Sequence, residues 1–135
     1  MRLLVDTHCW LWYLLAPERL NSKAQEILRE PENEILFSAA SAWEIVIKFS
    51  LGKLDLPLPP SEYIPNRLDL LGHQTLPIRQ DHVLKIEALP AHHRDPFDRV
   101  LIAQAQAESL PLMTADSAIT AYDVAILWAS LDRSP

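Results

Sequence analysis

Short apolar runs recur along the chain and set the first expectation for its fold. Most of them are rich in β-prone side chains and hardly alternate between polar and apolar positions. Continuous apolar runs of this length are typical of strands that are covered on both faces of a sheet. Five strands are predicted, at residues 3–5, 34–37, 74–78, 112–114 and 124–128.

Segments with helical length and composition separate these runs. Helices are predicted at residues 10–15, 43–51, 62–71, 81–89 and 97–109, with another between a cap at 21–22 and a turn at 31–33, and one or two helical turns at 117–122. Strands that alternate with helices favour an α/β fold, with a mostly parallel central sheet covered on both faces. Four prolines crowd into residues 53–65, which predicts an irregular segment there.

Length and composition limit what such a fold can be. With 135 residues, of which 49% are hydrophobic, residues 1–135 are expected to form a single domain around one core. The longest apolar run covers only residues 9–16, which predicts no membrane span. The single cysteine, Cys9, cannot form an internal disulfide and indicates a reducing compartment, so a cytoplasmic location is expected.

The charge balance narrows the choice of ligand. The chain has 18 acidic residues against 12 Lys and Arg, and its net charge of −6 argues against a general, sequence-blind nucleic-acid coat. Nucleic acid bound through metal ions remains compatible with that charge. Gly52 and Gly72 are the only glycines, so a Gly-rich phosphate loop is excluded and nucleotide-cofactor enzymes are disfavoured.

Acidic residues stand at the ends of two predicted strands. Asp6 directly follows residues 3–5, and Asp116 lies two residues beyond 112–114. Parallel strands bring their carboxyl ends to one edge of the sheet, where ligands bind. Each aspartate also precedes a helix, so helix capping is the competing explanation. Thr114, two residues before Asp116, can orient a carboxylate by a hydrogen bond.

Further carboxylates lie on or beside the predicted helices. Glu44 belongs to a polar stripe with Ser41 and Lys48 on an otherwise apolar helix. A solvent-facing stripe with a Glu–Lys pair is the competing explanation. Asp95 and Asp98 lie one turn apart at the start of the longest apolar helix, where capping explains one of them and leaves the other available.

Carboxylates gathered from several segments repel one another unless cations neutralise them. Clusters of oxygen ligands suit Mg²⁺ or Mn²⁺. Such ions activate water and stabilise both the attacking and the leaving oxygens of a phosphodiester. Metal-dependent phosphodiester hydrolysis is therefore the chemistry that these positions favour.

The other charged side chains near these acids have simpler explanations. His92 and His93 are expected to be an exposed loop pair, because histidines that bind metal usually have partners three to five residues away. Lys48, Arg94 and Arg99 are candidates for phosphate contacts, with surface ion pairs as an equal alternative.

Four segments form a recognisable pattern: Leu3-Leu4-Val5-Asp6-Thr7-His8, then Ser41-Ala42-Trp43-Glu44-Ile45 with Lys48, then Asp95-Pro96-Phe97-Asp98-Arg99 before Ile102-Ala103-Gln104-Ala105, and finally Leu112-Met113-Thr114-Ala115-Asp116. Together they closely resemble the PIN-domain ribonucleases, in particular the VapC toxins of toxin–antitoxin pairs. The resemblance covers nearly the whole chain in the right order, and four concordant motifs are far more specific than one.

The resemblance implies a three-layer α/β/α sandwich and an endoribonuclease that depends on Mg²⁺ or Mn²⁺ and cleaves RNA by a metal-activated water. It also implies a homodimer, and a cognate antitoxin that blocks the acidic site. The catalytic, metal-binding acids carried over are Asp6, Glu44, Asp98 and Asp116. Asp98 is preferred to Asp95 because it stands seven residues before Ala105, as in the family. Members of the family vary at the fourth acidic position, that of Asp116, and in whether further acids join it.

Two other functions stay open at this point. One is a non-catalytic PIN-like binding module that keeps the fold, and the other is a DNA-directed or structure-specific phosphodiesterase on the same scaffold. The presence of all four acids favours an enzyme, and either nucleic acid suits its chemistry.

Overall fold

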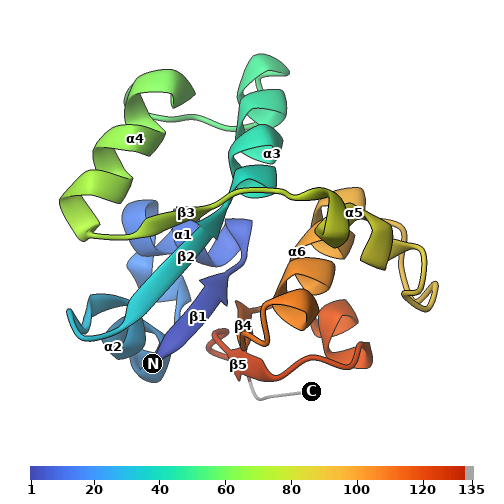
Figure 1. Cartoon of the computed structure of the whole chain (residues 1–135). Helices are drawn as coiled ribbons and strands as arrows, with labels where there is room; N and C mark the ends of the chain where they lie inside the picture. Colours follow the sequence, from blue (N-terminus) through green and yellow to red (C-terminus); the bar gives the residue numbers. More distant parts are fainter. Residues whose placement is uncertain (133–135) are drawn as a thin grey trace.

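The computed structural model describes residues 1–132, and its centre is a five-stranded sheet (Figure 1). The strands are β1 (Arg2–Val5), β2 (Glu34–Ser38), β3 (Gln74–Leu76), β4 (Leu112–Thr114) and β5 (Ile126–Trp128). Their order across the sheet is β3-β2-β1-β4-β5, so the first strand of the chain is the central one. All four neighbouring pairs are parallel, which confirms the predicted parallel sheet and brings every carboxyl end to one edge.

Helices connect the strands, mostly where the sequence predicted them and with slightly shifted ends. They are α1 (Thr7–Leu15), α2 (Ser22–Arg29), α3 (Ala39–Ser50), α4 (Pro60–Leu71), α5 (Gln80–Ile86) and α6 (Pro96–Ala107), with 3₁₀ helices at Pro17–Arg19 and Ser117–Ala121. Within residues 1–132, no helix is both long and apolar enough to cross a membrane.

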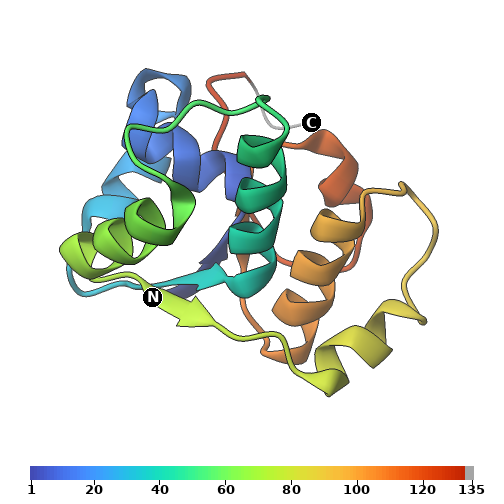
Figure 2. The ribbon, with the colours of Figure 1, turned by 90° about the horizontal axis from the view of Figure 1, so that it is seen from above.

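The central strand is covered on both of its faces. Leu3 and Val5 belong to a buried cluster with Trp10 of α1, whereas Leu4 belongs to a second buried cluster with Leu101 of α6. Seen from above, α1, α2 and α4 lie on one side of the sheet and α5 and α6 on the other (Figure 2). The predicted three-layer α/β/α arrangement is therefore confirmed.

Helix α3 stands at the carboxyl edge of the sheet, where it contacts α1, α4 and α6 (Figure 2). It begins at Ala39, four residues before the predicted start at residue 43. The reason is a cap: the hydroxyl of Ser38 accepts a hydrogen bond of 3.0 Å from the backbone N–H of Ala40, and small residues then continue the helix. The earlier start places Ser41 and Glu44 on one continuous helix beside the strand ends.

The proline-rich segment is more regular than predicted. Helix α4 begins at Pro60 and continues through Pro65, so the irregular stretch ends at Pro59. Pro60 stands in the first turn and breaks no hydrogen bond, because the N–H at that position has no intrahelical acceptor, whereas Pro65 lies inside the helix and leaves one carbonyl without its usual donor.

Truncating the central strand tests this packing. Leu4 is completely buried in the cluster around α6, so Leu4→Ala is expected to lower the free energy of unfolding by about 2–5 kcal/mol. The matched control is Leu70→Ala, because the Leu70 side chain is 68% exposed and its truncation should cost less than about 0.5 kcal/mol. Urea denaturation followed by circular dichroism measures both values. Equal losses in the two variants would contradict the assignment of Leu4 to the core.

Candidate active site

Two aspartates meet at the carboxyl edge where β1 and β4 lie side by side. Asp6 follows β1, is 4% exposed, and accepts a hydrogen bond of 2.8 Å on Oδ1 from the backbone N–H of Cys9. Asp116 follows β4, is exposed, and accepts one of 2.9 Å from the backbone N–H of Ala118. Both residues therefore cap helices, as the competing explanation held. One cap uses only one carboxylate oxygen, so capping does not exclude a second role for either side chain.

Thr114 links these two aspartates from the end of β4. Its buried hydroxyl donates a hydrogen bond of 2.6 Å to Oδ2 of Asp6 and accepts one of 3.0 Å from the backbone N–H of Asp116. The carboxylate that Thr114 orients is therefore that of Asp6, whereas it holds Asp116 through the backbone.

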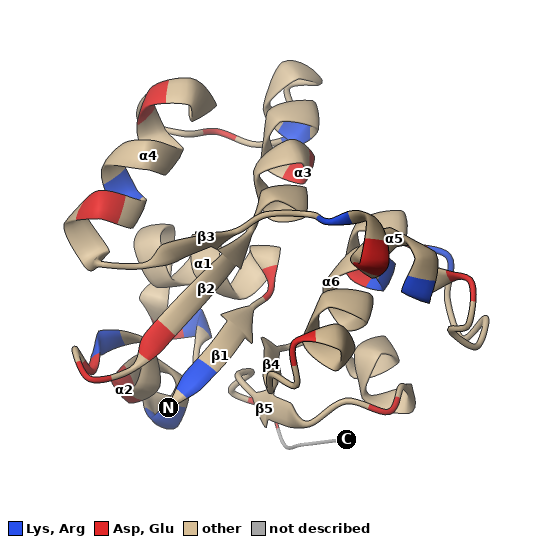
Figure 3. Cartoon of the chain, in the orientation of Figure 1, with Lys and Arg blue, Asp and Glu red and all other residues tan. Residues whose placement is uncertain are grey.

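The polar stripe on α3 faces the protein interior. Ser41 is completely buried and Glu44 is 2% exposed, whereas the neighbouring Trp43 is 60% exposed. The solvent-facing explanation is therefore wrong for Ser41 and Glu44. Lys48 lies one turn beyond Glu44, and its Nζ is 2.6 Å from Oε2 of Glu44; Figure 3 shows the acidic and basic positions on α3. Oε1 of Glu44 is buried without a hydrogen-bond partner.

The start of α6 separates the roles of its two aspartates. Oδ1 of Asp95 accepts hydrogen bonds from the backbone N–H groups of Phe97 and Asp98, at 2.9 and 3.2 Å. Asp95 is thus the cap, and the side chain of Asp98 is not needed for that task.

The pKa values show how close the acids lie to one another. The pKa of Asp98 is raised to about 8, most strongly by burial and then by the negative charges of nearby carboxylates, in decreasing order Asp95, Asp6, Asp116 and Glu44. Burial also raises the pKa of Asp6, although the hydrogen bond from Thr114 opposes the change. All four acids predicted from the sequence are therefore brought to one place, with Asp95 beside them.

His93 also lies in this cluster, which the sequence did not predict. Its Nε2 is 3.3 Å from Oδ2 of Asp98 and its Nδ1 is 2.8 Å from the hydroxyl of Tyr122. Ligand atoms of His93, Asp98 and Asp116 all lie within 4.8 Å of one another. The prediction that both histidines are exposed is confirmed for His92 and wrong for His93, which is half-buried. The only sequence signal was that His93 precedes Asp98 by five residues.

The basic residues near the cluster are largely engaged within the protein. Lys48 pairs with Glu44, and Arg99 donates to the carbonyl of Pro90 at 2.9 Å and to the hydroxyl of Tyr122 at 3.1 Å. Arg99 therefore holds the loop before α6 in place. Arg94 is exposed and stays a candidate for a phosphate contact.

The donor set fits a hard divalent cation. Four carboxylates supply oxygen ligands, which suits Mg²⁺ or Mn²⁺. The buried Oε1 of Glu44 has no hydrogen-bond partner, and burial raises the pKa values of Asp6 and Asp98, so a cation at this site would stabilise their charged forms. A pocket lined by Asp6, His8, Trp12, Ala115 and Asp116 opens onto this cluster.

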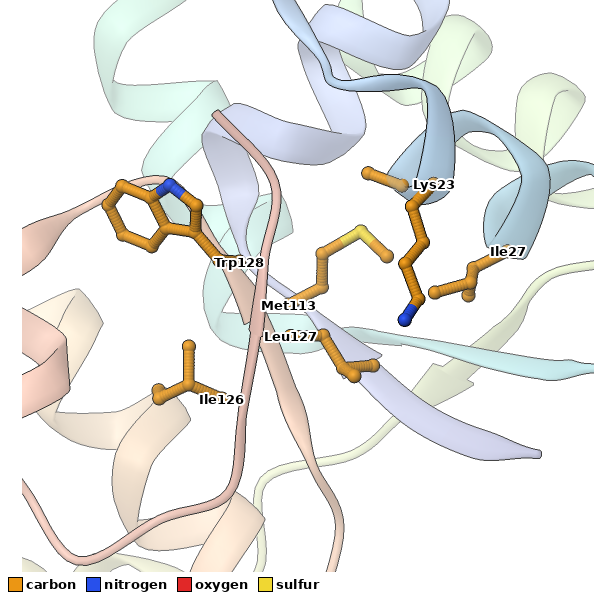
Figure 4. A pocket seen from close by; sticks show the side chains of 7 residues that line it. Lys23, Ile27, Met113, Ile126, Leu127 and Trp128 are labelled. Atoms are coloured by element: carbon orange, nitrogen blue, oxygen red, sulfur yellow. The ribbon is translucent and has the colours of Figure 1, made fainter. Parts of the chain in front are cut away.

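A second pocket lies away from the acids, between α2 and the strands β4 and β5 (Figure 4). Its lining is apolar apart from Lys23 and includes Ile27, Met113, Leu127 and Trp128. With no carboxylate, histidine or hydroxyl among its lining side chains, this pocket does not resemble the oxygen-rich acid cluster.

Removing the threonine hydroxyl tests its support of Asp6. In Thr114→Val, Oδ2 of Asp6 loses its donor, so Mn²⁺ binding is expected to weaken about 10- to 100-fold while the circular dichroism spectrum stays unchanged. Thr120→Val is the matched control, since the Thr120 hydroxyl bonds only to the nearby carbonyl of Ser117. Titration with Mn²⁺ followed by electron paramagnetic resonance gives the affinities. Equal affinity in the parent and in Thr114→Val would contradict this role.

The raised pKa of Asp98 predicts how stability depends on pH. Without metal, Asp98 keeps its proton in the folded state up to about pH 8 but loses it near pH 3.8 when unfolded. The free energy of unfolding should therefore fall as pH rises between these values, and less steeply in Asp98→Asn. At alkaline pH the variant should be more stable than the parent, because asparagine carries no charge in the cluster. The gain should be only roughly 1–2 kcal/mol, since partial solvation screens the charge of Asp98.

Urea denaturation in chelator across this pH range measures the effect. Asp69→Asn is the control, because Asp69 is exposed on α4 and its replacement should leave the pH dependence of the parent. Parallel pH profiles for the parent and Asp98→Asn would show that the pKa of Asp98 is not raised in the folded protein.

Known proteins resemble this chain in sequence and in architecture. It is 42% identical over 80 residues to "Ribonuclease VapC16" of Mycobacterium tuberculosis (strain ATCC 25618 / H37Rv), a match that covers 59% of this chain and 51% of that protein. The chain thus spans about half the length of this curated relative.

Solved structures resemble it over nearly all of its length. One is VapBC2 from Rickettsia felis bound to a promoter DNA fragment, with a TM-score of 0.71, 12% identity, and coverage of 94% of this chain and 98% of that one. Another is FitAcB from Neisseria gonorrhoeae, with a TM-score of 0.63, 21% identity, and coverage of 94% and 96%. At such low sequence identity, the similarity shows only that the fold is shared. The family model described as "PIN domain" matches residues 3–125, and the chain belongs to the PIN domain family.

Proposed function

We propose that this protein is a metal-dependent endoribonuclease of the VapC toxin type. Asp6, Glu44, Asp98 and Asp116 are its metal-binding and catalytic acids, and RNA is its substrate. One observation carries the proposal: acids from four separate segments converge on a site where burial and mutual repulsion raise the pKa of Asp98 to about 8. Such repulsion is costly unless the site binds cations, and perturbed carboxylates of this kind cluster at functional sites.

The comparisons support the ribonuclease assignment. The relative that is 42% identical is named a ribonuclease. Two solved structures that share the fold, VapBC2 from Rickettsia felis and a "Toxin-antitoxin complex from Klebsiella pneumoniae", are consistent with the toxin type. This chain keeps an acid at each of the four positions that its resemblance to the VapC toxins predicts.

The chain's own groups prepare the site in three ways. Thr114 holds one oxygen of Asp6, Asp95 caps α6 so that Asp98 is available, and Lys48 partly neutralises Glu44. A bound Mg²⁺ or Mn²⁺ supplies activation of water and neutralisation of the phosphodiester charge. Lys and Arg positions are scattered over several elements, among them β1, α3 and α4, and the net charge of the chain is −6, so we expect the metal site to be the main contact with RNA (Figure 3).

A protein partner belongs to the same proposal. We expect a cognate antitoxin that covers the acidic site, and a homodimer of this chain. Large apolar side chains are exposed on α3 and α5, among them Trp43 at 60% and Leu84 at 61%. Exposed apolar surface of this kind favours association with other protein surfaces.

Cleavage of total cellular RNA by the purified protein in Mn²⁺ tests the activity. The parent is expected to cleave, and Asp98→Asn is expected to lose about 100-fold or more of the rate, because it removes one metal-binding carboxylate. Asp69→Asn is the matched control and should cleave like the parent, since Asp69 is an exposed residue of α4.

Three other outcomes would each change the proposal. Equal cleavage by the parent and Asp98→Asn would assign the activity to a contaminant or to another site. No cleavage by either protein, with metal bound, would favour the non-catalytic binding module. Faster cleavage of a DNA strand than of the RNA strand with the same sequence would favour the DNA-directed phosphodiesterase.

A further inference from the structure

We propose that His93 is a positioning residue for Asp98, held by Tyr122 in the tautomer that donates from Nε2, and that it is not a metal ligand. The inference rests on the proposed metal site and goes beyond the four acids. His93 reaches from the loop before α6, and Tyr122 follows the 3₁₀ helix after β4. The two residues and Arg99 make a chain of hydrogen bonds that ends on a carboxylate of the acid cluster.

The hydroxyl of Tyr122 determines the direction of these bonds. It receives a hydrogen bond of 3.1 Å from the guanidinium of Arg99 and a second, of 3.3 Å, from the backbone N–H of His93. Both of these groups can only donate, so they occupy the two acceptor positions of the phenol oxygen. The single hydroxyl proton is therefore left to point to the third neighbour, Nδ1 of His93 at 2.8 Å.

The tautomer of His93 follows from this accounting. Because Nδ1 accepts the hydrogen bond from Tyr122, it carries no proton, and the ring proton of a neutral imidazole then lies on Nε2. Nε2 is the atom that faces Oδ2 of Asp98 at 3.3 Å, so it donates to that oxygen, which accepts whether the proton of the carboxyl group is absent or lies on Oδ1.

This assignment separates His93 from the metal-binding atoms near it. Distance alone groups His93 with Asp98 and Asp116, since their ligand atoms lie within 4.8 Å of one another. A histidine binds a metal through an unprotonated ring nitrogen. Nε2 is protonated here and Nδ1 is engaged by Tyr122, so neither nitrogen offers a free lone pair. The contact with His93 uses Oδ2 of Asp98 and leaves Oδ1 for a cation.

Tyr122, which holds this chain of hydrogen bonds, is buried and packed. Tyr122 is 4% exposed, and the ring of His92 packs edge-on against it with centroids 4.8 Å apart. Arg99 also donates to the carbonyls of Pro90 and Leu89, at 2.9 and 3.4 Å. The same arginine thus fixes the phenol oxygen and the loop that carries His93.

The tautomer is tested by nuclear magnetic resonance of protein labelled with ¹⁵N in its histidine rings, first without metal and then with Mg²⁺. The parent is expected to show Nδ1 of His93 unprotonated and Nε2 protonated in both samples. Tyr122→Phe removes the hydroxyl proton, so its His93 signals should move toward a mixture of tautomers. A proton on Nδ1, or loss of the Nε2 proton when Mg²⁺ is added, would overturn the proposal.

Metal affinity gives a second, independent readout. Glutamine keeps an N–H donor at the end of its side chain, so His93→Gln should bind Mn²⁺ within a few-fold of the parent, whereas His93→Ala should bind it about tenfold or more weakly. Equal losses in the two variants would indicate that His93 ligates the metal. Asp69→Asn is the control and should bind like the parent, because Asp69 is exposed on α4 and takes no part in this chain of hydrogen bonds.

These measurements separate the two proposals from each other. The metal-free spectrum and the Mn²⁺ titration use no RNA, so a protein with the expected tautomer that fails to cleave RNA would overturn only the proposed function. A protein that cleaves RNA but has the opposite tautomer would overturn only the role of His93.

Discussion

The burial and mutual repulsion of clustered carboxylates are the constraint on which the rest of this structure depends. Four acids come from three strand or helix ends and one helix face, and they meet because parallel strands share one carboxyl edge. Asp98 is affected most strongly, with a pKa raised to about 8. A packed hydrophobic core on each face of the sheet allows the fold to tolerate this local cost.

Helix α3 shows how far the site alters ordinary packing rules. A helix beside a core normally turns its apolar residues inward and its polar residues outward. In α3, Ser41 and Glu44 are buried, while Trp43 and Val46 are 60% and 45% exposed. The helix therefore presents its polar side to the acid cluster and part of its apolar side to the surroundings.

Much of the fold followed from the sequence because it depends on local patterns. The short apolar strands, their alternation with helices, and the division between Asp95 and Asp98 at the start of α6 were all predictable from neighbouring residues. The inward orientation of Glu44 was not, since it depends on where α3 contacts α1, α4 and α6.

His93 was unpredictable for the same physical reason. Its partner Tyr122 is 29 positions away in the chain, and the direction of their hydrogen bond depends on Arg99, which belongs to a third segment. Residue type and spacing carry no information about such a three-way contact. The four acids could be found because each stands at a strand end or on a helix face that the sequence itself marks.

The bond between Thr114 and Asp6 has a consequence for synthesis on the ribosome. The two residues are 108 positions apart, and β4 is the strand that pairs with the second edge of β1. A nascent chain that ends before residue 112 lacks this strand, the hydroxyl that orients Asp6, and Asp116. Pairing over such a distance also forms slowly. The nuclease proposed here therefore stays incomplete until residues 112–116 have been synthesised, although Asp6, Glu44 and Asp98 are made earlier.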